Sequence, residues 1–253
     1  MLKQLSHKNR GIQLATIVFL SLLLSSFNVV RVSTISFRSA DGLELTADQY
    51  FVSDTLPYIL LFHEQESSRG EFTTIAQRLC KMDYNCLAVD IRNGGNTNPI
   101  SNETAKRCRE NKCAQGLKDV ELDMQAAIDF ALGKSSRPVI LLGSGANASL
   151  CLKVAGENAN IKAVIALSPG EYFLPELKVQ ELAADLEKPI FVTSSKSEVP
   201  YASELSSGIP ESYLTLFKPE LGEGGRGSRA LTKENPYNSE YWLALILFFK
   251  DLI

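Results

Sequence analysis

The chain has 253 residues, of which 45% are hydrophobic and 22% are charged, so it is long enough and apolar enough for one large globular domain. This composition excludes a disordered chain and a small disulfide-dense scaffold. The net charge of -3 gives no basic excess, and we therefore expect no nucleic-acid partner. We also expect no metal and no cofactor.

An apolar segment stands at the N-terminus. Between Arg10 and Arg31 the chain runs without a charge through GIQLATIVFLSLLLSSFNVV, about the length that a helix needs to cross a bilayer. Lys3 and Lys8 precede it as well, which predicts a cytoplasmic N-terminus and an exported remainder. We expect residues 1–31 to be an uncleaved anchor, because small residues are poorly placed for cleavage, or alternatively a cleaved signal that leaves a secreted protein.

The five cysteines are compatible with an oxidising compartment if they pair. Cys80 with Cys86, and Cys108 with Cys113, are close enough in sequence to do so, although buried free thiols are the alternative. Cys151 lies in an apolar helical stretch, where we expect a small core residue.

The first predicted structure after this segment is an antiparallel hairpin. Two strand-like runs at 32–39 and 43–51 flank Asp41-Gly42, a pair typical of tight turns.

From there, short apolar runs alternate with amphipathic stretches, which predicts a mostly parallel, doubly wound sheet with helices on both faces. The expected strands are 58–63, 86–91, 139–143, 163–168, 190–195 and 213–217, and the expected helices are 72–82, 117–132, 148–158, 176–186 and 239–253. Residues 93–116 are predicted to be the longest irregular stretch.

One strand-to-helix junction is made almost entirely of small residues. Gly143-Ser144-Gly145-Ala146-Asn147-Ala148 follows an apolar strand and opens a helix, as a nucleophile elbow does. This block resembles the elbow of the α/β-hydrolase superfamily, in particular its dienelactone-hydrolase-like branch, whose pattern is Gly-x-Ser-x-small-Ala. The resemblance puts Gly145 on the nucleophile, and glycine has no side chain with which to attack. Ser144 is the alternative nucleophile, reached by a one-residue slip of the turn.

The resemblance extends to the loop after the strand at 58–63. There the family keeps a histidine followed by a backbone N–H donor of the oxyanion hole, which implies His63 in this loop, Gln65 as one donor and Ala146 as the second.

Two further positions follow from the same resemblance. Glu198 falls where the family carries the acid that orients the catalytic histidine, and Arg226 falls where that histidine belongs. Arginine stays protonated and has no acceptor atom, so it cannot take a proton from a serine. The chain has two histidines, and neither lies in its C-terminal third.

The resemblance therefore implies an α/β-hydrolase fold over residues 32–253, without the serine and histidine of a serine hydrolase. We expect a membrane-tethered, non-hydrolytic homologue with a retained anion-binding pocket, because a helix N-terminus and Arg226 both favour an anion. The anion is either a small carboxylate ligand or Glu198 folding back onto Arg226. The alternatives are an active carboxylic-ester or lactone hydrolase that uses Ser144, and a scaffold for protein contacts.

Overall fold

The computed structural model describes residues 29–252. The predicted membrane segment lies outside the described residues except for Val29 and Val30. Within residues 29–252, no helix is both long enough and apolar enough to cross a membrane.

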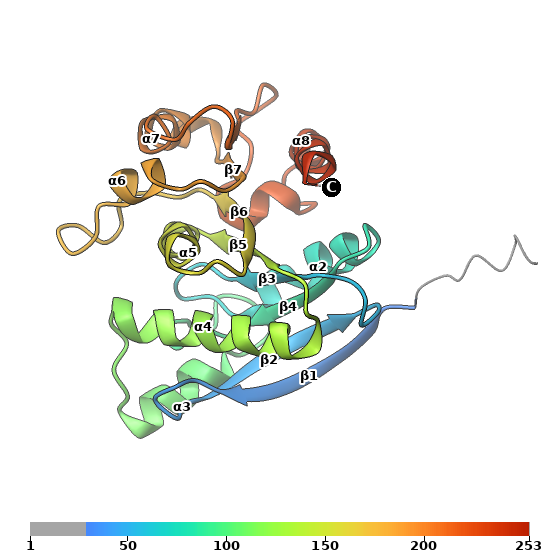
Figure 1. Cartoon of the computed structure of the whole chain (residues 1–253), viewed down its shortest axis with the longest axis vertical. Coiled ribbons are helices and arrows are strands. Elements are labelled where there is room, and N and C mark those ends of the chain that lie inside the picture. The colour runs from blue at the N-terminus through green and yellow to red at the C-terminus, as the bar shows by residue number, and fades with distance from the viewer. Residues whose placement is uncertain (1–28, 253) are drawn as a thin grey trace, which may run out of the picture.

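One eight-stranded sheet forms the centre of the molecule, with the strand order β1-β2-β4-β3-β5-β6-β7-β8 (Figure 1). The two pairs that involve β2 are antiparallel, and the remaining pairs are parallel. The expected hairpin and parallel sheet are thus both present. The strands are β1 (Arg31–Arg38), β2 (Glu44–Phe51), β3 (Tyr58–Phe62), β4 (Asn85–Val89), β5 (Val139–Ser144), β6 (Ile161–Leu167), β7 (Ile190–Thr193) and β8 (Leu214–Phe217).

Helices cover both faces of this sheet. The α-helices are α2 (Thr73–Cys80), α3 (Glu103–Asn111), α4 (Leu117–Lys134), α5 (Ala146–Glu157), α6 (Val179–Ala184), α7 (Val199–Leu205) and α8 (Asn238–Asp251), and the short 3-10 helices are η1 (Arg69–Phe72), η2 (Lys196–Glu198) and η3 (Gly227–Leu231). One face packs against α4, α5, α6 and α7, and the other packs against α2 and α8 (Figure 1).

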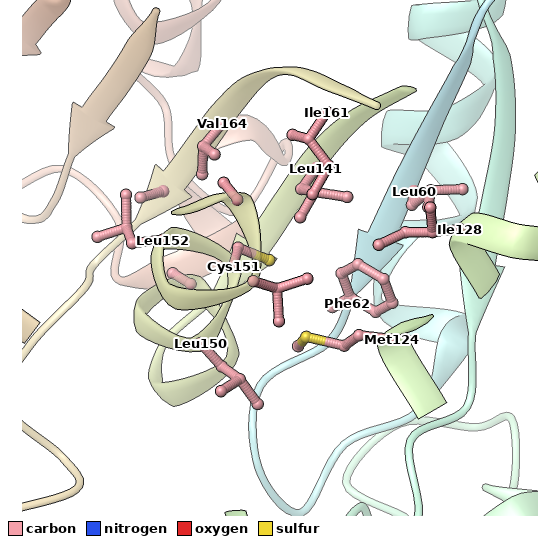
Figure 2. Close-up of a cluster of buried hydrophobic side chains, with 14 of the residues drawn as sticks. Leu60, Phe62, Met124, Ile128, Leu141, Leu150, Cys151, Leu152, Ile161 and Val164 are labelled. Carbon is pink, nitrogen blue, oxygen red and sulfur yellow. The ribbon is translucent and has the colours of Figure 1, made fainter. Parts of the chain in front are cut away.

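The central strands are apolar throughout because both of their faces are buried. In β3, Leu60 and Phe62 belong to the core under α4 and α5, whereas Ile59 and Leu61 belong to the core under α2 and α8. This alternation follows from the two-residue period of a strand, and it accounts for the unbroken apolar runs in the sequence. Figure 2 shows the first of these cores, where Cys151 lies among apolar side chains as expected.

One expectation from the sequence is wrong. The stretch 93–116 contains helix α3, which begins after Asn102, whose side chain accepts a hydrogen bond from the Ala105 amide. Of the two alternatives for Cys80 and Cys86, the structure has free thiols, both buried in the core. The other pair, Cys108 and Cys113, forms a disulfide.

Candidate functional site

The site lies at the carboxyl ends of the parallel strands, where loops from β3, β5, β6, β7 and β8 meet. Because these strands are parallel neighbours, their carboxyl ends lie along one edge of the sheet. Residues from distant parts of the sequence therefore come together there.

Gly145 occupies the tip of the sharp turn between β5 and α5. Its backbone angles are φ 59° and ψ -126°, a conformation that residues with a side chain adopt only under strain. The turn is also tight at Gly143, where an added Cβ would lie 2.6 Å from the Cα of Ala148. The turn therefore has the strained, close-packed shape that the small residues predict, with position 145 at its tip.

The carboxylate of Glu64 fills the space over this tip. A Cβ added to Gly145 would lie 2.5 Å from Oε1 and 2.7 Å from Cδ of Glu64, well inside van der Waals contact. Glu64 comes from the loop after β3, and its backbone N–H donates to Oε2 of Glu71 at 3.0 Å. A side chain from the loop thus occupies the place where a side chain at position 145 would begin.

Arg226 holds this carboxylate. Its Nη2 and Nε donate to Oε1 of Glu64 at 2.8 and 3.1 Å, and its Nη1 donates to Oε1 of Glu198. Nη2 also donates to the hydroxyl of Tyr172 at 3.1 Å. Burial lowers the pKa of Arg226, but the pairing with Glu64 outweighs it and raises this pKa above its ordinary value. One fixed cation therefore bridges two carboxylates.

Glu198 is positioned by hydroxyl groups as well as by Arg226. Its Oε2 accepts hydrogen bonds from the hydroxyls of Ser168 and Ser195, both at 2.8 Å. Ser168 in turn accepts from the amide of Gly227 at 2.8 Å, which ties the loop after β6 to the residue that follows Arg226. Burial raises the pKa of Glu198, but these hydrogen bonds and Arg226 together lower it below its ordinary value. Glu198 is thus held as a carboxylate.

Comparisons with known proteins agree on the architecture. No family model matches the chain, and no curated protein matches it either. Solved structures do match, among them the esterase Pf2001 of Pyrococcus furiosus, with a TM-score of 0.66 and 18% identity over 88% of this chain and 93% of that one. A putative dienelactone hydrolase from Klebsiella pneumoniae gives a TM-score of 0.64 at 16% identity, covering 87% of this chain and 99% of that one.

The chain has the α/β-hydrolase fold. A third solved structure, the acetyl xylan esterase from Paenibacillus sp. R4, agrees with a TM-score of 0.62 at 15% identity over 88% of this chain and 85% of that one. These identities are low, so they establish the fold and its dienelactone-hydrolase-like layout alone.

Ser144, the alternative nucleophile, lies one residue before the tip of the α/β-hydrolase turn. It is the last residue of β5 and is fully buried. Its hydroxyl oxygen accepts a hydrogen bond from the Ser228 amide at 3.0 Å, and no histidine, lysine or carboxylate of residues 29–252 hydrogen-bonds to it. The structure thus gives Ser144 no general base.

His63 is fully buried beside this α/β-hydrolase site and is saturated by backbone contacts. Its Nε2 accepts from the amide of Ile91 at 2.9 Å, so Nδ1 donates to the carbonyl of Glu64 at 2.7 Å. The carbonyl of His63 accepts from the side chain of Asn147 at 2.6 Å. His63 therefore fixes the loop that carries Glu64.

The two expected backbone donors belong to the two loops that meet at the site. Ala146 is the first residue of α5, directly after Gly145, and Gln65 is an exposed residue directly after Glu64.

The sequence did not identify Glu64, Ser168 or Tyr172 as site residues. All three lie in blocks that the resemblance covers, after β3 and after β6, where turn-forming residues predict only loops. The available signal for Glu64 was a charged residue two positions after a fully apolar strand, at the edge of the sheet where sites form.

Proposed function

We propose that this protein is an exported, membrane-tethered homologue of the α/β-hydrolases that does not hydrolyse substrates, and that its degenerate site is an anion site occupied by its own Glu64. The observation that carries the proposal is the position of the Glu64 carboxylate, 2.5 Å from where a side chain at residue 145 would begin and paired with Arg226.

The chemistry of the site supports this reading. Glycine at the tip supplies no nucleophile, and Arg226 supplies no base. The start of α5 and the guanidinium of Arg226 both favour negative charge, and the Glu64 carboxylate is the group that meets them. The sequence offered a small carboxylate ligand or Glu198 as the anion. Glu198 contacts Arg226 through one oxygen, but the carboxylate over Gly145 is that of Glu64, which the sequence did not suggest.

A pure scaffold is less favoured than a binding protein, because a charged cavity of about 680 Å³ lies open beside Glu64. A scaffold has no need of an open, charged cavity.

Hydrolysis is tested with an activated aryl ester such as p-nitrophenyl acetate. We expect the rate with the full-length protein to equal the rate in buffer, and Ser144→Ala to leave it unchanged. An esterase rate that disappears in Ser144→Ala would overturn the proposal and establish the Ser144 alternative.

The anion site is tested by chemical rescue. Glu64→Ala removes the internal carboxylate and leaves Arg226 with one partner, which we expect to lower the melting temperature by about 2–4 °C, the equivalent of about 1 kcal/mol in a domain of this size. Millimolar acetate should restore part of this loss in Glu64→Ala and have little effect on the wild type, with sodium chloride as the control for ionic strength.

The double variant Glu64→Ala/Arg226→Gln is the matched control for this rescue, because it lacks the cation that would hold acetate. Equal acetate effects in the single variant, the double variant and the wild type would show that the position over Gly145 is not an anion site.

A further inference from the structure

The cavity beside Glu64 is separate from the space over Gly145 that the carboxylate fills. Its volume of about 680 Å³ falls in the range of small-molecule sites. Its walls come from the loop after β3, the start of η1 and α2, residues 97–99 and residues 229–234. Apart from Gly70 and Pro99, every lining residue has a polar side chain.

The wall formed by residues 64–74 carries carboxylate oxygens without donors. Oε2 of Glu71 accepts a hydrogen bond from the backbone N–H of Glu64. Oε1 of Glu71 is buried and has no hydrogen-bond partner in the part of the chain that is described. Glu64 uses Oε1 for both of its bonds to Arg226, and its Oε2 accepts none from residues 29–252. The buried Oε1 of Glu71, left without a donor, costs free energy. An ammonium group with its three N–H donors would complement the negative charge of the two carboxylates on this wall.

The wall formed by residues 229–234 carries the opposite charge. Arg229 and Lys233 are both exposed, and neither forms a salt bridge with any residue in 29–252. Glu234 lies on the same segment, so this wall keeps a net positive charge of one. A guanidinium with an adjacent ammonium is suited to a carboxylate, which it can bind through two parallel hydrogen bonds.

Hydroxyl groups line the cavity as well as charged groups. Ser67, Thr73, Thr74, Thr97 and Thr232 line the cavity. Hydroxyls both donate and accept, and can therefore satisfy the N–H and C=O groups of a peptide bond.

We propose that this cavity binds a small zwitterion, an amino acid or short peptide, with its ammonium at Glu71 and Glu64 and its carboxylate at Arg229 and Lys233. Cavity size, charge separation and the unpartnered oxygen of Glu71 support the same ligand class. The proposal goes beyond the anion site over Gly145 and does not depend on it, because it requires neither displacement of Glu64 nor the absence of hydrolysis.

The test uses the full chain in detergent micelles or nanodiscs and the dipeptide Ala-Ala as the probe, titrated by calorimetry up to about 10 mM, where even weak sites register. N-acetyl-Ala-Ala lacks the ammonium, and Ala-Ala-amide lacks the carboxylate. We expect Ala-Ala to bind, and each blocked analogue to bind at least about tenfold more weakly, because each loses one charged partner. This comparison uses the unmodified protein and does not depend on how any variant folds.

Two variants then assign the ends of the ligand. Glu71→Gln keeps an oxygen for the Glu64 amide but removes the charge, and should weaken Ala-Ala while leaving the affinity for N-acetyl-Ala-Ala unchanged. Arg229→Gln should weaken Ala-Ala and leave Ala-Ala-amide unchanged. Glu211→Gln and Arg137→Gln, exposed residues outside the cavity lining, are the matched controls.

The absence of Ala-Ala binding, or equal binding of the probe and both blocked analogues, would overturn the proposal. Neither result would affect the acetate rescue of Glu64→Ala, so the failure of this inference and the failure of the anion site can be told apart.

Discussion

The turn has no room for a side chain at position 145 beside that of Glu64, because a Cβ at position 145 would lie 2.5 Å from the Glu64 carboxylate. Gly145→Ser also places a side chain at φ 59°. We expect Gly145→Ser to lower the free energy of unfolding by about 1–3 kcal/mol through backbone strain and this clash. Because the clashing atom ends a flexible side chain, Glu64→Ala should relieve part of the cost in the double variant, as urea denaturation in a double-mutant cycle would show.

Strictly additive effects of Gly145→Ser and Glu64→Ala would mean that the two positions do not interact.

The clash between these two positions also affects any attempt to restore hydrolysis. Replacing Gly145 with serine and Arg226 with histidine leaves Glu64 in the place of the new side chain, so we expect the third change, Glu64→Ala, to be required before ester hydrolysis can appear.

Glu198 gives the site a specific pH dependence. Its pKa is lowered in the folded protein, so its carboxylate stabilises the fold above the ordinary carboxyl pKa of about 4.3, and this contribution is lost as the pH falls through the lowered value. We expect the wild type to be more stable than Glu198→Gln at neutral pH, with the difference shrinking below about pH 4. Unfolding free energies of the two proteins across this pH range measure the difference, with Glu211→Gln as the control. A difference that grows in acid would contradict the lowered pKa of Glu198.

The resemblance to the α/β-hydrolases predicted positions 145, 198 and 226, which all lie in loops that follow apolar strands. It did not identify Glu64, because the direction of that side chain depends on a turn far along the chain and on Arg226, which comes later still. Local patterns predict where the chain turns. They do not predict which loop side chain fills the space that a missing side chain leaves.

At the scale of elements, a buried ion-pair cluster joins the hairpin to the sheet and to α4. Arg92 follows β4 and is fully buried; its Nη1 pairs with Asp41 in the hairpin turn at 2.6 Å, and its Nη2 pairs with Asp123 in α4 at 2.7 Å. Burial raises the pKa of Asp123 to about 6 even with Arg92 beside it. These three residues join the three elements beside an apolar cluster that Leu43 and Leu45 form with Ala126 of α4.

We expect Asp123→Ala to lower the free energy of unfolding by about 3–5 kcal/mol, because it leaves part of the Arg92 charge buried without its partner. Urea denaturation measures the loss. Asp129→Ala, an exposed position in the same helix, should change stability by less than about 0.5 kcal/mol. Similar effects of the two variants would mean that the cluster does not hold these elements together.

The strands were predictable because burial on both faces leaves unbroken apolar runs, which no other soluble element of that length requires. Helix α3 was not predicted, because its residues are almost all polar and give no apolar period; the Asn102 cap was its only clear signal. For Cys80 and Cys86 the sequence left a disulfide and free thiols open, because closeness in sequence permits a bond without requiring it; both thiols are free and buried.

At the scale of the whole molecule, the disulfide between Cys108 and Cys113 bears on where the domain folds. Disulfides persist in oxidising compartments and are rare where glutathione keeps thiols reduced. Export, which the positive residues before the apolar segment predict, stays a prediction, and it would give this bond a compartment in which it persists. The buried thiols of Cys80, Cys86 and Cys151 are free in the same structure.

We expect protein isolated from its native membrane, quenched in acid and alkylated in denaturant, to take up label on three cysteines without reductant, because two of the five are joined. Reduction should expose all five. Peptide mass spectrometry identifies the labelled positions, and a Cys108→Ser/Cys113→Ser variant, labelled on the same three cysteines with or without reductant, is the control. Label on Cys108 and Cys113 before reduction would place the domain in a reducing compartment and contradict export, whatever the site over Gly145 does.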